Sequence, residues 1–125
     1  MKIIVDTNTL VRFFTDDIPQ KAKLVEKLLK DRQDIFIPDV VFPELEYILI
    51  YEYKFPRKKL FEIYAFLASQ KNISLSENVR KAIIIFSKTK LDMADCIIAA
   101  SSLKGLLASF DKELLQVDKI KPFWK

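Results

Sequence analysis

Short apolar runs alternate with longer segments of helical periodicity along the whole chain. The apolar runs predict strands at residues 3–5, 35–37, 73–75 and 106–110, with a last one near Ile120. Between them, apolar residues recur every three or four positions, which predicts helices over residues 9–14, 19–30, 39–52, 57–69, 79–88, 92–102 and 112–115. Alternating strands and helices predict an α/β domain with a parallel sheet covered on both faces.

Two of the predicted strands end in an aspartate that a helix start then follows. Asp6 comes directly after residues 3–5, and Asp111 comes directly after residues 106–110. Parallel strands deliver the side chains at their carboxyl ends to one edge of the sheet, so both carboxylates are expected there. The structural alternative is that each aspartate only caps the helix that follows it.

Two further acids fall on helix faces that otherwise look apolar. Glu44 is surrounded by apolar residues of the predicted helix 39–52, and Asp95 shares a face with Ile98 and Ala99. A carboxylate on an inward face needs a partner, although a glutamate can also reach solvent or pair with a lysine. Asp92, at the start of the same helix as Asp95, is explained as a cap and is kept as a possible extra ligand.

The composition excludes several kinds of chemistry. The chain has no histidine, so Ser-His-Asp triads and histidine-ligated zinc sites cannot form. Cys96 is the only cysteine and Gly105 the only glycine, which excludes an intrachain disulfide, a P-loop and a dinucleotide-binding turn. We expect Cys96 to be a small buried residue, and carboxylates to carry any catalysis.

Charge and length complete the description. The net charge is +4, from 21 basic and 17 acidic residues. If several acids gather at one metal site, the remaining surface is strongly basic and suits a polyanion, although a solvated lysine-rich surface explains the charge equally well. No apolar run approaches the roughly 20 residues of a membrane span, and no signal-peptide pattern begins the chain, so we expect a soluble cytoplasmic protein. Without a linker or repeat, residues 1–125 are expected to form one domain.

Considered together, Asp6, Glu44, Asp95 and Asp111 predict a metal site. Converging carboxylates repel one another, and burial raises their pKa values, unless a divalent cation compensates the charge. Oxygen ligands without histidine or thiolate favour Mg²⁺ or Mn²⁺ over zinc. Such an ion polarises a phosphoryl oxygen and activates water, so a phosphodiester is the natural substrate.

Four short motifs, in order and across nearly the whole chain, resemble PIN-domain nucleases, particularly the VapC toxins of prokaryotic toxin–antitoxin pairs. They are Val-Asp-Thr-Asn at residues 5–8, Pro-Glu-Leu at 43–45, Ala-Asp-Cys-Ile-Ile-Ala-Ala at 94–100 and Ser-Phe-Asp-Lys at 109–112. The family more often has threonine where this chain has Ser109, a departure that keeps the hydroxyl.

The resemblance implies a PIN-like three-layer α/β/α domain with a parallel sheet of about five strands. It also implies a Mg²⁺- or Mn²⁺-dependent endoribonuclease, usually a homodimer, that a small antitoxin protein inhibits. Asp6 and Asp95 would be the principal metal ligands, Glu44 a further acid and Asp111 a more variable fourth one. Asn8 and Ser109 would then orient a ligand, water or phosphate.

We expect water to attack the phosphorus in line, leaving a 5′-phosphate and a 3′-hydroxyl, with a carboxylate positioning or deprotonating the water. The candidates for RNA backbone contacts are basic side chains near residues 12 and 54–59, namely Arg12, Lys54, Arg57 and Lys58. A solvated charge cluster is the alternative interpretation of residues 54–59.

Two other functions remain open from the sequence. Residues 6–9 superficially resemble the Asp-x-Asp-x-Thr motif of haloacid-dehalogenase-like phosphatases, but Asn8 replaces the second aspartate, which is that family's general acid. The other possibility is a non-catalytic PIN-like module that binds RNA or protein. Release of phosphate from p-nitrophenyl phosphate would identify the phosphatase, and metal-dependent RNA cleavage would identify the nuclease.

Overall fold

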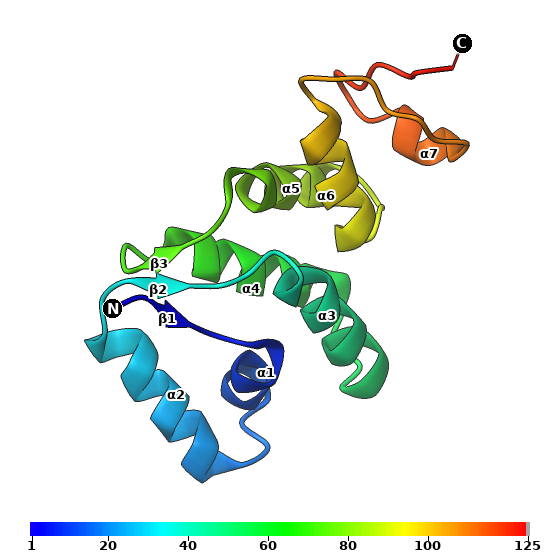
Figure 1. Cartoon of the computed structure of the whole chain (residues 1–125). Helices are drawn as coiled ribbons and strands as arrows, with labels where there is room; N and C mark the ends of the chain where they lie inside the picture. The colour runs from blue at the N-terminus through cyan, green and yellow to red at the C-terminus, as the bar shows by residue number, and fades with distance from the viewer. Residues whose placement is uncertain (125) are drawn as a thin grey trace. The chain divides into compact units, whose positions relative to one another are not determined.

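The computed structural model describes residues 1–124, and their contacts group them into two compact units. Residues 1–76 form the N-terminal unit, and the C-terminal unit begins at Glu77. Helices and a parallel sheet are both present, so the predicted α/β class is confirmed (Figure 1). The assignment of residues 1–125 to one domain stays a prediction.

A three-stranded parallel sheet forms the centre of the N-terminal unit. Its strands are β1 (Ile3–Ile4), β2 (Ile35–Phe36) and β3 (Ile73–Ser74), in the order β1-β2-β3. Ile3 pairs with Ile35, and Ile35 in turn pairs with Ile73. Ile35 is fully buried, as expected for the central strand of a parallel sheet, and Ile73 on the edge strand β3 is nearly so.

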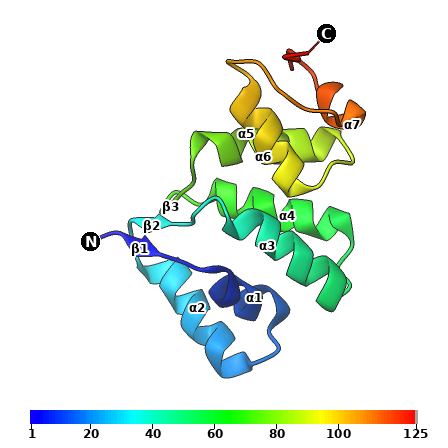
Figure 2. The same cartoon turned by 45° about the vertical axis from the view of Figure 1, so that its right-hand side comes forward.

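Helices connect these strands at the positions that the periodicity predicted. They are α1 (Thr7–Thr15), α2 (Pro19–Asp31), α3 (Val41–Tyr47), the π-helical turn η1 (Ile48–Glu52) and α4 (Arg57–Ser69). Pro19 occupies the first turn of α2, where its missing N–H costs no hydrogen bond. α1 packs against both α2 and α3, as Figure 2 shows.

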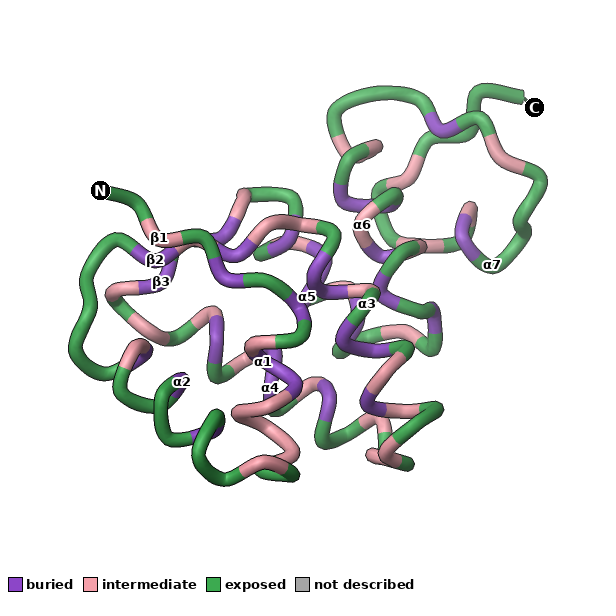
Figure 3. Tube along the Cα trace, turned by 60° about the horizontal axis from the view of Figure 1, so that its bottom comes forward, coloured by how far each residue is buried: buried purple, intermediate pink, exposed green. Residues whose placement is uncertain are grey.

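The C-terminal unit consists mainly of α5 (Glu77–Lys88) and α6 (Met93–Ser102), which pack closely together, followed by the short helix α7 (Lys112–Leu115). Buried and exposed residues alternate along these helices (Figure 3). Cys96 is fully buried on the inner side of α6. Its predicted role as a small core residue is therefore confirmed.

The sheet of residues 1–124 has three strands rather than the five or so that were expected. The two remaining segments, residues 106–110 and the segment near Ile120, do approach one another in the C-terminal unit. They form a single parallel bridge between Leu107 and Pro122. Because Pro122 has no backbone N–H, it cannot donate the hydrogen bond that would continue a ladder.

Candidate active site

Asp6 is held in place by the helix that it starts. It follows the buried Val5 at the end of the β1 segment and is the N-cap of α1. Its Oδ1 accepts hydrogen bonds from the backbone N–H of Thr9 at 3.0 Å and from the Thr9 hydroxyl at 2.7 Å. The bond from the Thr9 hydroxyl, followed by the bond from the Thr9 N–H, lowers the pKa of Asp6. Its exposed carboxylate is therefore charged at neutral pH.

Glu44 belongs to α3 and lies beside α1 because these two helices pack against each other. The hydroxyl of the buried Thr7 donates a hydrogen bond to Glu44 Oε1 across 37 positions of sequence. Glu44 itself is exposed, so the expectation that it lies on a buried face is wrong. The inner side of α3 carries Val41, Phe42 and Leu45 instead.

Thr7 and Glu44 border an open hollow in the N-terminal unit. Its volume is about 580 Å³, and its lining comes from the start of α1 and from α3 and η1: Thr7, Asn8, Pro43, Glu44, Tyr47 and Ile48. One carboxylate and one carboxamide therefore face a space large enough for part of a nucleotide. The π-helical turn η1 supplies Ile48 to this wall, and such turns occur frequently at functional sites.

A hydrogen-bond network fixes the orientation of Asn8. Arg12 Nη2 donates to Asn8 Oδ1 at 3.1 Å, while Arg12 Nη1 forms an ion pair with Asp17. Tyr53 donates its hydroxyl to the same Asp17 oxygen at 2.9 Å. The Arg12 guanidinium, more than any other group, lowers the pKa of Asp17 to about 2. With its carbonyl oxygen occupied, Asn8 has its amide N–H groups as donors for the hollow.

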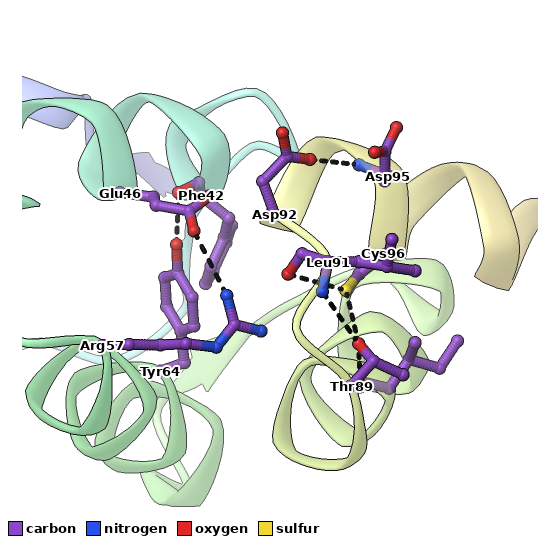
Figure 4. A network of polar contacts seen from close by, with 10 residues as sticks. Phe42, Glu46, Arg57, Tyr64, Thr89, Leu91, Asp92, Asp95 and Cys96 are labelled. Atoms are coloured by element: carbon purple, nitrogen blue, oxygen red, sulfur yellow. Dashed lines mark hydrogen bonds and ion pairs between the residues drawn. The ribbon is translucent and has the colours of Figure 1, made fainter. Parts of the chain in front are cut away.

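Asp92 and Asp95 lie at the start of α6. Asp92 is the N-cap of the helix, and its Oδ1 accepts the backbone N–H of Asp95 at 2.9 Å (Figure 4). Burial is the first cause that raises the pKa of Asp95, and the negative charges of Asp92 and Asp111 raise it further. No lysine or arginine within residues 77–124 forms an ion pair with Asp95. Asp95 is therefore a half-buried carboxylate with like-charged neighbours.

The apolar face predicted for Asp95 is only partly correct. Ala99 is fully buried, but Ile98 exposes 44% of its surface. The buried side of α6 runs through Met93, Cys96, Ala99 and Ala100, one position away from the predicted stripe. Asp95 consequently lies at the margin of the core rather than within it.

Asp111 is the N-cap of α7, which confirms the predicted helix start, whereas the strand predicted over residues 106–110 is wrong: only Leu107 forms a bridge, and Phe110 exposes 86% of its surface. Its Oδ1 accepts from the backbone N–H groups of Glu113 at 3.0 Å and Leu114 at 3.2 Å. Ser109 Oγ accepts the backbone N–H of Asp111 at 3.0 Å. Ser109 thus helps to orient the backbone at Asp111, while its role toward a ligand stays a prediction.

The basic residues predicted to contact RNA differ in the protein groups that their side chains already contact. Arg12 is engaged by Asp17, as described above, and Arg57 lies 3.8 Å from Glu46 in an ion pair (Figure 4). Lys54, at a positive φ of 60°, donates to the carbonyl oxygen of Tyr51 at 2.9 Å. Lys58 is exposed on the first turn of α4. Their contacts with RNA stay predictions.

Sequence reasoning missed Glu46, which is the buried acid of α3. It exposes 9% of its surface and pairs with Arg57, next to the hydrogen bond that Tyr64 donates to the carbonyl oxygen of Phe42 at 2.6 Å (Figure 4). Sequence reasoning also missed the hydroxyl of Thr7. The position of Thr7 directly after Asp6 was the one available signal.

The four predicted acids are divided between the two units. Asp6 and Glu44 belong to the N-terminal unit, and Asp95 and Asp111 to the C-terminal unit. Residues 1–76 contain no group of three or more acidic or cysteine side chains close enough to hold an ion, and the same is true of residues 77–124. A site of four acids therefore requires both units, and their convergence stays a prediction.

Comparisons with known proteins bear on the whole chain. The family model described as PIN domain matches residues 3–120. The chain is also similar to a VapC ribonuclease of Aquifex aeolicus (strain VF5), with 25% identity over 107 residues, which cover 81% of this chain and 78% of that protein. No helix among residues 1–124 is long and apolar enough to cross a membrane. From the match over residues 3–120, the chain belongs to the PIN domain family.

Proposed function

We propose that this protein is a divalent-metal-dependent endoribonuclease and the toxin of a VapBC-type toxin–antitoxin pair. The observation that carries the proposal is Asp95, whose pKa is raised by burial and by two neighbouring carboxylates at the start of α6 and α7. A half-buried carboxylate without a basic partner in its own unit destabilises the free protein. A cation bound there would remove this penalty. Membership of the PIN family and the similarity to a VapC ribonuclease support the nucleic-acid substrate.

The donor set fits Mg²⁺ or Mn²⁺. Asp6, Glu44, Asp95 and Asp111 offer carboxylate oxygens, and the chain lacks the histidines that would favour zinc. The charge repulsion at Asp95 is the kind that a hard divalent cation relieves. When bound, such an ion would polarise a phosphoryl oxygen and activate a water molecule for attack.

The chain's own residues prepare the site for this reaction. The bonds from Thr9 hold the Asp6 carboxylate charged and fixed, and the Thr7 hydroxyl orients Glu44 at the hollow. Asn8 presents its amide N–H groups as donors for a phosphate oxygen. One of the four carboxylates would position the attacking water or accept its proton. Hydrolysis leaves a 5′-phosphate and a 3′-hydroxyl.

The proposed partners follow from the same assignment. The substrate is RNA, whose phosphates meet the basic side chains Lys54 and Lys58, with Arg12 and Arg57 available if their ion pairs open. A small antitoxin protein binds and inhibits the nuclease, which acts in the cytoplasm as a homodimer. The net charge of +4 favours association with a polyanion.

Cleavage of a mixed RNA panel tests the proposal. The full chain is incubated with 5′-labelled RNAs in EDTA, in Mg²⁺ and in Mn²⁺, and Asp95→Asn is compared with the wild type. Asp118→Asn, which removes an exposed acid of the same unit, is the matched control. We expect metal-dependent products with 5′-phosphates, a strong loss of cleavage with Asp95→Asn and no loss with Asp118→Asn. Unchanged cleavage by Asp95→Asn would refute the assigned role.

A binding readout separates metal binding from catalysis. Mn²⁺ should raise the melting temperature of the wild type, since a ligand that binds only the folded protein stabilises it. The rise should be smaller for Asp95→Asn. Equal shifts for both proteins would remove Asp95 from the metal site. RNA binding without cleavage in either metal would support the non-catalytic PIN-like module instead, and phosphate release from p-nitrophenyl phosphate would support the phosphatase.

A further inference from the structure

Three aromatic side chains near the C-terminus form an exposed cluster, the aromatic platform, defined as Phe110, Phe123 and Trp124. The rings of Phe110 and Trp124 stack almost parallel, with their centroids 4.8 Å apart and an interplanar angle of 6°. Phe123 meets Trp124 edge-on at 5.4 Å. Phe110 exposes 86% of its surface, Phe123 56% and Trp124 51%. The platform therefore presents flat aromatic surface to solvent.

Backbone hydrogen bonds position the platform, although its residues come from two segments of the chain. The Leu107 N–H donates to the carbonyl oxygen of Lys121, and the Phe123 N–H donates to that of Leu107, both at 2.8 Å. These bonds flank the bridge between Leu107 and Pro122, and Figure 1 shows the last segment of the chain beside the loop between α6 and α7. A preorganised surface loses less conformational entropy when it binds a ligand.

The location of the platform indicates its ligand. Phe110 is the residue directly before Asp111, a carboxylate of the proposed active site, and directly after Ser109. Lys119 and Lys121, both exposed, come just before the platform in the chain. Exposed aromatic rings together with lysines in the same segment suit single-stranded nucleic acid, because bases stack on the rings while phosphates meet the cations.

We propose that the aromatic platform stacks an unpaired nucleobase of the RNA substrate, with Phe110 and Trp124 as the stacking residues. This inference rests on the proposed function for the identity of the nucleic acid. Stacking depends little on which base is present, since every base has a π-face. The platform thus adds affinity for unpaired RNA and holds a neighbouring phosphodiester near Asp111 without imposing a strict cleavage sequence.

Trp124 is the only tryptophan of the chain, so its fluorescence reports on the platform directly. In EDTA, the full chain is titrated with an unpaired 12-nucleotide oligoadenylate and with a 12-unit abasic ribose phosphate of the same charge. We expect the oligoadenylate to quench Trp124 fluorescence and the abasic strand to leave it unchanged. Quenching by both strands to the same extent would contradict stacking.

Two substitutions of Phe110 and one control sharpen the test. Phe110→Leu should weaken oligoadenylate binding by roughly 5- to 100-fold, while Phe110→Tyr should bind like the wild type. Phe66→Leu, which removes an aromatic ring 38% exposed on α4, should not change binding. The slope of affinity against salt concentration should be the same for all four proteins, because the phosphate contacts are untouched. Binding by Phe110→Leu equal to that of the wild type would overturn the proposal.

The outcomes distinguish this inference from the proposed function. If the wild type cleaves RNA and Phe110→Leu has the same KM for unstructured RNA, the inference fails and the nuclease assignment remains. If base-dependent quenching is lost in Phe110→Leu but no metal supports cleavage, the platform remains and the nuclease assignment fails. If Phe110→Leu alters the oligomeric state while RNA binding persists, the platform is a protein interface and the inference is refuted.

Discussion

Asp6 combines two roles that substitution can separate, because it both caps α1 and supplies a carboxylate to the proposed metal site. Asparagine caps a helix about as well as aspartate does, whereas alanine does not cap at all. Asp6→Asn should therefore keep the structural role and lose the chemical one. Asp6→Ala should lose both.

The structure gives the size of the structural part. Asp6 Oδ1 accepts two hydrogen bonds, at 3.0 Å from the Thr9 N–H and at 2.7 Å from the Thr9 hydroxyl. Loss of such a cap costs about 0.5–2 kcal/mol in the free energy of unfolding, which for a domain of this size lowers Tm by roughly 2–8 °C. Asp6→Asn should stay within about 0.5 kcal/mol of the wild type.

Thermal and urea unfolding in EDTA, together with RNA cleavage in Mg²⁺ and Mn²⁺, measure the two roles separately. Cleavage should fall by at least about 10²-fold in both variants. Acid titration adds a check, since the Thr9 bonds lower the pKa of Asp6 from its ordinary 3.8. The wild type should therefore gain stability over Asp6→Asn above pH 3.8 and lose that gain as the pH falls through the lowered pKa.

Two results would refute this reasoning. Cleavage by Asp6→Asn at the wild-type rate would mean that Asp6 is only a cap and that the ion is held elsewhere. Equal destabilisation by asparagine and alanine would mean that the charge of Asp6, rather than its cap geometry, stabilises α1. Glu52→Gln, an exposed acid at the end of η1, is the control for a general effect of removing one negative charge.

Three further variants test individual contacts. In EDTA at pH 7, Asp95→Asn should unfold at the same or a higher urea concentration than the wild type, because burial and neighbouring charges raise the Asp95 pKa and penalise its charged form. The difference between the two proteins should vanish in acid. Marked destabilisation of Asp95→Asn would instead indicate that Asp95 is a structural hydrogen-bond acceptor. Asp17→Asn should make the fall in Tm between pH 3.8 and about 2 less steep. Arg12 lowers the pKa of Asp17 to about 2, and the stability from this pair is lost as the pH falls through that range. Parallel plots of Tm against pH for the variant and the wild type would contradict this. Tyr64→Phe should lower the free energy of unfolding by about 1–3 kcal/mol in guanidinium titrations, because the Phe42 carbonyl oxygen loses a buried donor at 2.6 Å; a cost near zero would show that another donor replaces it.

Local structure was determined by the sequence to a large extent. A carboxylate can reach the N–H groups two or three residues ahead of it, so the caps at Asp6, Asp92 and Asp111 depend only on short stretches of chain. The same holds for Pro19 at the start of α2. Alternating strands and helices likewise sufficed for the α/β class and the parallel sheet, because crossovers of that length permit few other arrangements.

The tertiary structure decided which acids are buried and what they bind. Glu44 and Glu46 lie two residues apart on α3, and periodicity alone favoured the wrong one as inward. Their environments depend on α1 and α4, which bring Thr7 to Glu44 and Arg57 to Glu46. Contacts between residues so distant in sequence arise only when helices pack, and their geometry depends on the volumes of many side chains at once. The number of strands was decided in the same way, since pairing depends on which backbone groups meet across the sheet.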